Sequence, residues 1–184
     1  MTAQGVTLFD TPLGRCGIAW GARGIVGVPL PEAAGAERAH LLRRFPDAPE
    51  TVPPPEVQDV VKRIVALLSG ESPDLAPVTI DLRDVPPFDR SVYEITRNIG
   101  RGATRSYGEI ATELGDPGAA RAVGQALGRN PFPIIVPCHR VLAAAGRPGG
   151  FSAHGGVATK LRLLAIEGAR AGGEPDLFDA PAGP

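Results

Sequence analysis

The sequence predicts an α+β protein with a mixed N-terminal half and a helical C-terminal half. Short strand-like apolar runs separated by turn signals open the chain, and closely spaced helix signals fill its second half. With 184 residues, of which 43% are hydrophobic, the chain can bury a substantial core. The pattern changes near residue 86, so we expect one domain over residues 1–85, a second over residues 86–170 and a disordered acidic tail over residues 171–184.

The N-terminal half shows strand signals first and helix signals afterwards. Apolar runs occupy V-T-L-F-D, R-C-G-I-A-W and I-V-G-V-P-L, and the turn G-A-R-G between the last two predicts a β-hairpin. We expect one helix after Pro31 and a second over E-V-Q-D-V-V-K-R-I-V-A-L-L that ends at Gly70. Residues 78–82, V-T-I-D-L, alternate as a strand does. Cys16 lies in a strand-like run, which indicates a small buried side chain.

The C-terminal half contains the signals of a helix-turn-helix, after a first helix over D-R-S-V-Y-E-I-T-R-N-I. In S-Y-G-E, Ser106 and Glu109 can bond to each other's backbone amides as a capping box, and Gly115 ends the helix that follows. Asp116 and Pro117 then supply the N-cap and the first residue of the next helix. Two helices joined by a short Gly-containing turn form this motif, although plain helical hairpins have similar patterns.

The second helix of the motif, P-G-A-A-R-A-V-G-Q-A-L-G, is rich in small residues such as Ala120 and Gly124. A helix that reads bases in the major groove normally carries several long polar side chains, and this one has few. A backbone that approaches closely suits the minor groove, with Arg121 inserted into the duplex. The alternative is a tightly packed internal helix.

A cysteine and a histidine stand side by side in P-I-I-V-P-C-H-R-V, after an apolar run at residues 134–136 that predicts a buried strand. The thiolate is the reactive form of cysteine, and an imidazole is the usual base that produces it. Because neighbouring strand residues face opposite sides, direct contact between Cys138 and His139 requires a tight turn or a bridging water. Glu167, at the end of a later helix, could orient the histidine. An inert buried thiol is the alternative, and the flanking His139 favours reactivity.

Several other classes of protein are disfavoured. The chain has two cysteines, no C-x-x-C and no histidine cluster, so we expect no metal site. No apolar run reaches the roughly 18 residues of a membrane span, and the N-terminus lacks a signal-peptide pattern, so we expect a cytoplasmic protein. The net charge of −1 hides an excess of basic residues over 91–170. That excess suits a polyanionic partner, but an ordinary solvated surface explains it as well.

The motif P-C-H-R-V, preceded by N-P-x-P-I-I-V, S-Y-G-E-I-A and A-A-R-A-V-G-x-A, resembles the O6-alkylguanine-DNA alkyltransferases, or methylated-DNA–protein-cysteine methyltransferases. The downstream G-G-F-S and G-G-V-A-T-K-L-R-L-L-A-I-E-G fit the same family. The resemblance is strong over residues 86–168 and looser over residues 1–85. It implies a ribonuclease-H-like N-terminal domain and a winged-helix-like helix-turn-helix domain that carries the cysteine.

The resemblance also implies an activity, the direct reversal of DNA damage. Such proteins bind double-stranded DNA through its minor groove, rotate an O6-alkylguanine out of the stack and move its alkyl group, methyl above all, to their own cysteine. O4-alkylthymine is a second candidate substrate. The product is a stable thioether, so each molecule would react once. No metal or organic cofactor, no membrane and no obligate protein partner is expected, and a monomer is the simplest state.

Residue roles follow from the same resemblance. Cys138 would be the alkyl acceptor, His139 the base that acts through a water, and Glu167 the group that orients it. Asn130, a turn residue whose side chain can bond to nearby backbone, would brace the site.

DNA-binding and pocket residues are implied in the same way. Arg121 would enter the base stack and Tyr107 would press on the target phosphate, with Ala120 and Gly124 close to the DNA. The residues implied to line the alkylguanine pocket are Val141, Phe151, Ser152 and Pro133. Phe151 stands where many members have tyrosine, and the loop that contains His154 is longer than in some of them.

Three other functions are compatible with parts of the sequence. A cysteine hydrolase would use Cys138, His139 and Glu167 with an oxyanion hole, but such sites normally bring cysteine and histidine together from distant segments. A sensor of alkylated DNA would not need the cysteine that this chain has. A transcription factor would need more long polar side chains on its second helix.

Overall fold

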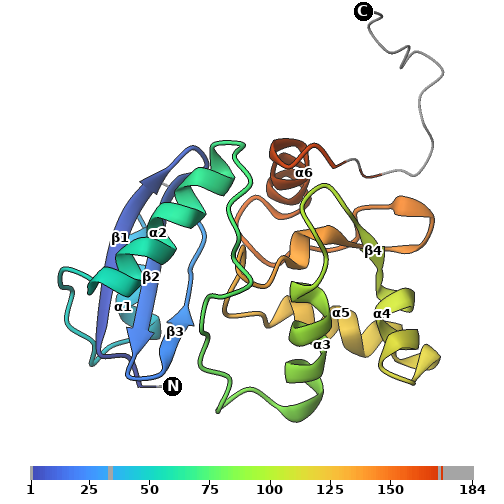
Figure 1. The fold of residues 1–184 in the computed structure, drawn as a ribbon, viewed down its shortest axis with the longest axis horizontal. Helices are drawn as coiled ribbons and strands as arrows, with labels where there is room; N and C mark the ends of the chain where they lie inside the picture. The colour runs from blue at the N-terminus through green and yellow to red at the C-terminus, as the bar shows by residue number, and fades with distance from the viewer. Residues whose placement is uncertain (1, 33–34, 170, 172–184) are drawn as a thin grey trace, which may run out of the picture.

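The N-terminal half folds as a three-stranded antiparallel sheet with a helix on each face (Figure 1). The structure, a computed structural model, describes residues 2–32, 35–169 and 171. The strands follow chain order, β1 (Gly5–Thr11), β2 (Gly14–Gly21) and β3 (Gly24–Gly27). The predicted hairpin is therefore present between β2 and β3. Gly24 follows its turn with a φ of +122°, and a Cβ there would lie 2.4 Å from the Thr79 carbonyl oxygen, so only glycine fits.

Alternating side chains of β2 divide between two apolar clusters. Ile18 and Trp20 pack with the buried face of α2 (Pro55–Leu68), while Ala19 faces the other way, toward Leu41 of α1 (Glu37–Arg44). The period of two along a strand thus seats one helix on each side of the sheet.

Two predictions for this half need correction. The first helix begins at Glu37 rather than directly after Pro31, because Gly35 has a φ of +83° and interrupts a right-handed helix. Residues 78–82 make only an isolated parallel bridge, Ile25 with Ile80, instead of a regular strand. The buried Asp81 carboxylate accepts hydrogen bonds from Arg83, and this local turn ends the pairing.

The C-terminal half is helical, as predicted, with one two-stranded parallel pair (Figure 1). Its α-helices are α3 (Pro87–Arg97), α4 (Tyr107–Glu113), α5 (Ala120–Gly128) and α6 (Gly156–Ile166). Short 3₁₀ turns lie at η1 (Pro117–Ala119), η2 (Cys138–Arg140) and η3 (Ala144–Gly146), and the strands are β4 (Arg105–Ser106) and β5 (Val141–Leu142).

The helix-turn-helix forms with the predicted caps. The Glu109 amide donates to Ser106 Oγ at 3.1 Å, and the Ser106 amide donates to Glu109 Oε2 at 2.6 Å, which completes the capping box. Asp116 caps η1 by accepting from the Gly118 amide at 3.2 Å. This 3₁₀ turn comes first, so α5 begins at Ala120, three residues later than Pro117.

The segment before the cysteine is a buried turn and not the predicted strand. Ile134 has a φ of +74° and is 1% exposed, and the Val136 amide donates to the Phe132 carbonyl at 2.8 Å. Three of the seven residues from 131 to 137 are prolines, which have no N–H to donate to a sheet. The apolar pattern therefore predicted the burial correctly and the conformation wrongly.

Both halves share one apolar cluster, which contains Ile18 and Trp20 from the sheet as well as Val123 and Val136 from the C-terminal half. Helix α6 contacts α2 and η2, so it lies over the junction (Figure 1). The proposed division of the chain near residue 86 stays a prediction. The expected disordered tail lies, except for Ala171, outside the described residues. Within the described ranges, no helix is long and apolar enough to cross a membrane.

Candidate active site

The turn that precedes Cys138 is held by the side chain of Asn130. Its Nδ2 donates to the Val136 carbonyl at 2.9 Å, and its Oδ1 accepts from the Phe132 amide at 2.9 Å. Cys138 then opens η2 with 8% of its surface exposed, and its own amide donates to the Val136 carbonyl. Asn130 thus fixes the backbone that presents the thiol.

Behind the cysteine, Glu167 accepts hydrogen bonds from two buried side chains of η2. His139 Nε2 lies 3.0 Å from Glu167 Oε1. Arg140 donates from Nε to Oε2 and from Nη2 to Oε1, both at 2.8 Å, and from Nη1 to the Ile99 carbonyl. Burial alone would raise the pKa of Glu167, but these hydrogen bonds outweigh it and lower the pKa to about 2. The carboxylate is therefore ionised at neutral pH.

The charge on Glu167 fixes the tautomer of His139. An ionised carboxylate only accepts hydrogen bonds, so the neutral imidazole carries its proton on Nε2 and its lone pair on Nδ1. Nδ1 is buried and has no hydrogen-bond partner among the described residues. The site therefore holds a free proton acceptor one residue after the thiol.

The thiol and the imidazole are both neutral in the resting site. Burial raises the pKa of Cys138, a shift that the Asn130 hydrogen bond and the charge of Lys160 oppose. Burial also lowers the pKa of His139, although the hydrogen bond to Glu167 opposes that change. A thiolate consequently forms only when the thiol proton moves to an acceptor. Cys16, by contrast, is buried in the sheet, where burial raises its pKa to about 11.

The sequence reasoning missed two buried cations, Arg140 and Lys160. Lys160 has no exposed surface, donates from Nζ to the Val141 carbonyl and lies 5.7 Å from the centre of the Tyr107 ring. Burial lowers its pKa to about 8. Lys160 lies on the same face of α6 as the buried Leu163 and Leu164, which follow it by three and four residues. This spacing could have predicted that Lys160 is buried.

In front of Cys138 lies a pocket of about 520 Å³, which we call the base pocket. Of the residues predicted for DNA and substrate, it brings together Tyr107, Ala120, Arg121, Gly124, Phe151 and Ser152. The Tyr107 ring packs closely on two glycines, since a Cβ at Gly124 would lie 3.8 Å from it and one at Gly149 3.1 Å. Arg121 is exposed at the edge of this pocket.

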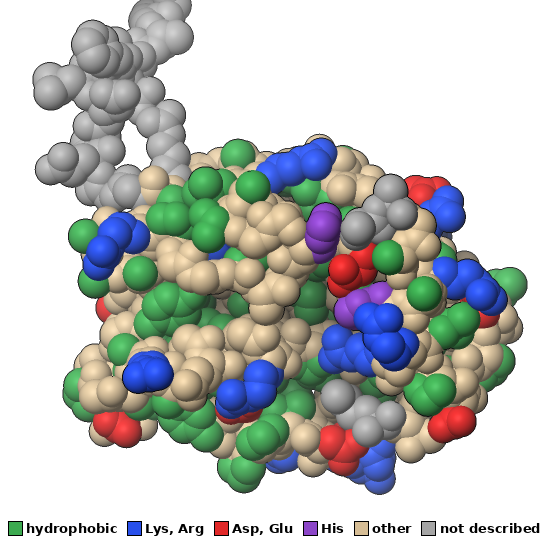
Figure 2. Space-filling model, turned by 180° about the vertical axis from the view of Figure 1, so that it is seen from behind, with side chains coloured by type: hydrophobic (Ala, Val, Ile, Leu, Met, Phe, Trp, Pro, Cys, Tyr) green, Lys and Arg blue, Asp and Glu red, His purple; other side chains and the backbone are tan. Residues whose placement is uncertain are grey.

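Two predicted pocket residues lie elsewhere. Val141 is fully buried, and its carbonyl accepts from Lys160, so it supports the base pocket from behind without lining it. Pro133 lines a second pocket of about 250 Å³ that also reaches Cys138. Basic side chains do not gather into one field on the face shown in Figure 2, where they are spread among apolar and acidic ones.

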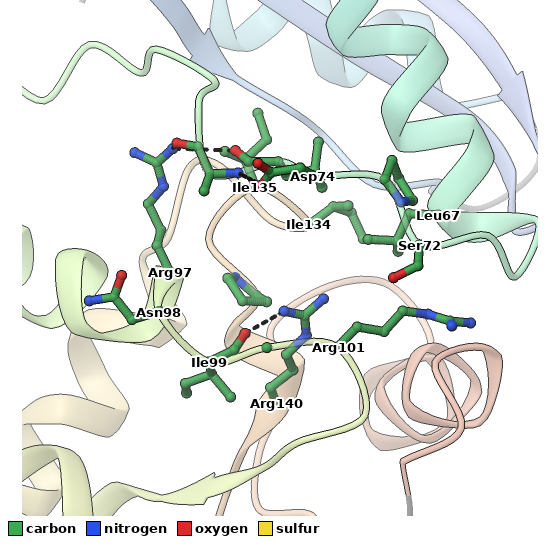
Figure 3. A pocket seen from close by; sticks show the side chains of 15 residues that line it. Leu67, Ser72, Asp74, Arg97, Asn98, Ile99, Arg101, Ile134, Ile135 and Arg140 are labelled. Atoms are coloured by element: carbon green, nitrogen blue, oxygen red, sulfur yellow. Dashed lines mark hydrogen bonds between the residues drawn. The ribbon is translucent and has the colours of Figure 1, made fainter.

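A third cavity, of about 480 Å³, lies behind η2 and does not reach Cys138 (Figure 3). Two of its guanidinium groups are bound to backbone carbonyls: Arg97 donates to Ala76 and Val78, and Arg101 donates to Gly70 and Ile166. These bonds tie the 70–78 connector to the C-terminal half, so we assign this cavity a structural role.

Fold and site together define an α+β protein that presents a buried cysteine, backed by a His–Glu pair, beside a helix-turn-helix. A sequence model described as "6-O-methylguanine DNA methyltransferase, DNA binding domain" matches residues 87–169. The methylated-DNA–protein-cysteine methyltransferase of Mycobacterium tuberculosis is 44% identical over 129 residues, which cover 70% of this chain and 76% of the relative. That of Methanothermobacter thermautotrophicus is 32% identical over 157 residues, 85% of this chain and 81% of the relative.

Solved structures of related proteins share this fold over nearly the whole chain. Mycobacterium tuberculosis OGT in complex with DNA has a TM-score of 0.71 at 36% identity, covering 91% of this chain and 95% of that one. The O6-methylguanine-DNA methyltransferase of Pyrococcus kodakaraensis has a TM-score of 0.68 at 29% identity, covering 89% and 99%. The chain therefore belongs to the methylated-DNA–protein-cysteine methyltransferase family, which confirms the resemblance found in the sequence.

Proposed function

We propose that this chain repairs DNA by moving the methyl group of O6-methylguanine to Cys138, once per molecule. The observation that carries the proposal is the position of Cys138, at the base pocket and one residue before an imidazole whose Nδ1 is free to accept a proton. The volume of about 520 Å³ lies in the range of pockets that bind a small organic ligand, which supports a nucleobase as the occupant.

The proposed reaction is a single displacement. The Cys138 thiol gives its proton, through a water, to Nδ1 of His139, and the carboxylate of Glu167 stabilises the imidazolium that forms. The thiolate sulfur then bonds to the methyl carbon as the bond from that carbon to guanine O6 breaks. The electron pair stays on the guanine, which takes up one proton, so the products are a neutral guanine and a thioether. A thioether has no acyl carbon that water could attack, which makes the transfer stoichiometric and irreversible.

The proposed partner is double-stranded DNA, bound through its minor groove by the helix-turn-helix. The complex of the Mycobacterium tuberculosis relative with DNA supports DNA as the partner. Ala120 and Gly124 are half-buried small residues of α5 that line the base pocket, and they support a close approach of the helix backbone. Base extrusion costs a few kcal/mol, and the exposed position of Arg121 beside the base pocket supports its insertion into the vacated position. Action in the cytoplasm as a monomer belongs to the same proposal.

A titration tests this function. The chain is mixed with increasing amounts of a duplex that contains one methyl-labelled O6-methylguanine, and the label bound to protein is counted. We expect a plateau at one methyl group per chain, together with unmodified guanine in the DNA. Label that never reaches the protein, or guanine repair that continues beyond one equivalent, would contradict the proposal.

A further inference from the structure

Asp89 is a buried carboxylate that the proposed reaction does not use. It lies in the first turn of α3, is 3% exposed and is bound by the guanidinium of Arg129, 40 residues later in the chain. Arg129 donates from Nη2 to both carboxylate oxygens at 3.0 Å and from Nε to Oδ2 at 3.1 Å. No other described residue donates a hydrogen bond to this carboxylate. A planar fork of this kind fixes both the distance and the angle between the two side chains.

The same end of α5 is held on α3 by a second side chain. Arg129 is the residue at which α5 ends, and one turn earlier the Ala126 carbonyl accepts a hydrogen bond of 3.0 Å from the Tyr93 hydroxyl. Tyr93 is buried and follows Asp89 by four residues, so both side chains leave the same face of α3. The two helices contact each other within the C-terminal half (Figure 1). Helix α3 therefore determines where α5 ends.

The residue that follows Arg129 is Asn130, whose side chain holds the turn before Cys138. Beyond it, the Pro131 carbonyl accepts a hydrogen bond of 2.9 Å from the Val28 amide of the N-terminal half. Asn130 thus stands between two fixed points, one on each side in the chain. The bond to Pro131 is made by backbone atoms, whereas the fixed point at Arg129 depends on the Asp89 side chain.

We propose that Asp89 and Arg129 are a positioning pair, which fixes Asn130 in the orientation that presents the Cys138 thiol for alkyl transfer. The inference rests on the proposed function of Cys138. Neither side chain lines the base pocket, so the pair acts through Asn130 and not on the guanine. A buried ion pair often adds little stability beyond that of apolar groups of similar volume, but it specifies one geometry. A displacement reaction depends on such geometry, because a misplacement of about 1 Å can cost about a hundredfold in rate.

The position of Asn130 also has a signature at the sulfur itself. Burial raises the pKa of Cys138, and the hydrogen bond from Asn130 and the charge of Lys160 oppose that shift. If the turn moves, the bond from Asn130 is lost, while Lys160 on α6 keeps its bond to the Val141 carbonyl. The thiol would then ionise at a higher pH. A pair that served stability alone would leave the thiol unchanged in the folded protein.

Single-turnover rates of methyl transfer at saturating DNA test the inference, at a temperature at which circular dichroism shows each variant to be folded. Asp89→Asn has the same shape and retains a weaker, uncharged hydrogen bond. It should slow transfer by about threefold to tenfold and leave DNA affinity within about twofold. The effect is limited because the Arg129 side chain is 59% exposed and partly screened by water. The matched control is Asp81→Asn, a buried carboxylate held by Arg83 in the N-terminal half, which should react at the wild-type rate.

A double variant tests whether the two residues act as a unit. Arg129→Gln alone leaves the buried Asp89 carboxylate without its counter-ion, so it should slow transfer at least as much as Asp89→Asn. Asp89→Asn combined with Arg129→Gln should restore the rate of Asp89→Asn alone, because no charge is then unpaired. If Arg129→Gln does not fold, the double variant and Asp89→Asn still give this comparison.

A third measurement needs no DNA. The rate of Cys138 alkylation by iodoacetamide, followed against pH by peptide mapping, should rise at a higher pH in Asp89→Asn than in wild type. The same rate for Cys16 should not change, because burial and Thr11 determine its pKa. Failure of methyl transfer by the wild type would contradict the proposed function itself, whereas the alkylation profiles would still test the pair.

Three outcomes would overturn the inference. An Asp89→Asn variant with the wild-type transfer rate and alkylation profile would show that the pair serves stability alone. Weaker DNA binding by Arg129→Gln, with an unchanged rate at saturation, would show that Arg129 holds a DNA phosphate instead. A double variant whose slowing is the product of the two single effects would show that the two residues act independently.

Discussion

His139 and Glu167 are joined by a hydrogen bond of 3.0 Å between Nε2 and Oε1, and both side chains are buried. The pair comes from η2 and from the end of α6, so its distance depends on how α6 packs over the turn that holds Cys138. Arg140 bonds to the same carboxylate, which makes Glu167 the centre of a buried network in the C-terminal half.

Glu167→Gln should lower the free energy of unfolding by about 3–5 kcal/mol, because it leaves the buried Arg140 guanidinium without its counter-ion. Urea unfolding at neutral pH measures this loss. The control is Asp81→Asn, which removes a buried carboxylate whose partner, Arg83, is 54% exposed and can be solvated. A smaller loss in Glu167→Gln than in the control would show that the network contributes little to stability.

The stability of the protein should fall on mild acidification through His139. Burial depresses the folded-state pKa of His139 below its ordinary value of 6.5, so the unfolded chain binds a proton at a higher pH than the folded chain. The stabilising contribution is therefore complete above pH 6.5 and is lost as the pH falls through the lower, folded-state pKa. In urea titrations between pH 7 and 5, wild type should lose more stability than His139→Gln. If the free energy of unfolding changes with pH equally in both proteins, the depressed pKa of His139 is contradicted.

Lys160→Met should make the Cys138 thiol harder to ionise. The substitution keeps an unbranched apolar stem and removes the charge that lowers the pKa of Cys138. The rate of Cys138 alkylation by iodoacetamide, followed against pH by peptide mapping, should therefore rise at a higher pH in the variant than in wild type. Cys16 serves as the internal reference, because burial and Thr11, and not Lys160, shift its pKa. If the pH dependence of Cys138 alkylation is the same in the variant and in wild type, Lys160 contributes to packing only.

Arg121→Ala should slow repair of duplex DNA by about tenfold to a hundredfold, the equivalent of roughly 1–3 kcal/mol toward base extrusion. Reaction with free O6-methylguanine base, which needs no extrusion, should keep its wild-type rate. Single-turnover rates on both substrates give the comparison. Arg90→Ala provides a control, since Arg90 is an exposed arginine that donates to the Leu82 carbonyl. Equal slowing on both substrates would mean that Arg121 acts on the guanine rather than on the duplex.

Features set by local chemistry were predictable from the sequence. The capping box of Ser106 and Glu109 and the Asp116 cap depend on residues within three positions of each other, and all of them form. The run at 134–136 was predicted as a strand because apolar periodicity measures burial, whereas the surrounding prolines decide the backbone conformation.

The missed features depend on contacts between distant segments. Arg140 meets a carboxylate 27 residues away, and Lys160 meets a carbonyl 19 residues away. The second pocket beside Cys138, which Pro133 lines, joins residues of α1 to a turn about a hundred residues later in the chain. Such partners become visible only when the packing of the two halves is known.

The most direct test of the account is an intact mass, followed by peptide mapping, after reaction with a duplex that contains one O6-methylguanine. The account predicts that the chain gains one methyl group in place of one hydrogen, that the modification maps to Cys138, and that Cys138→Ser binds the same DNA unmodified. An unmodified wild-type chain bound to the lesion, or a methyl group on any residue other than Cys138, would contradict it.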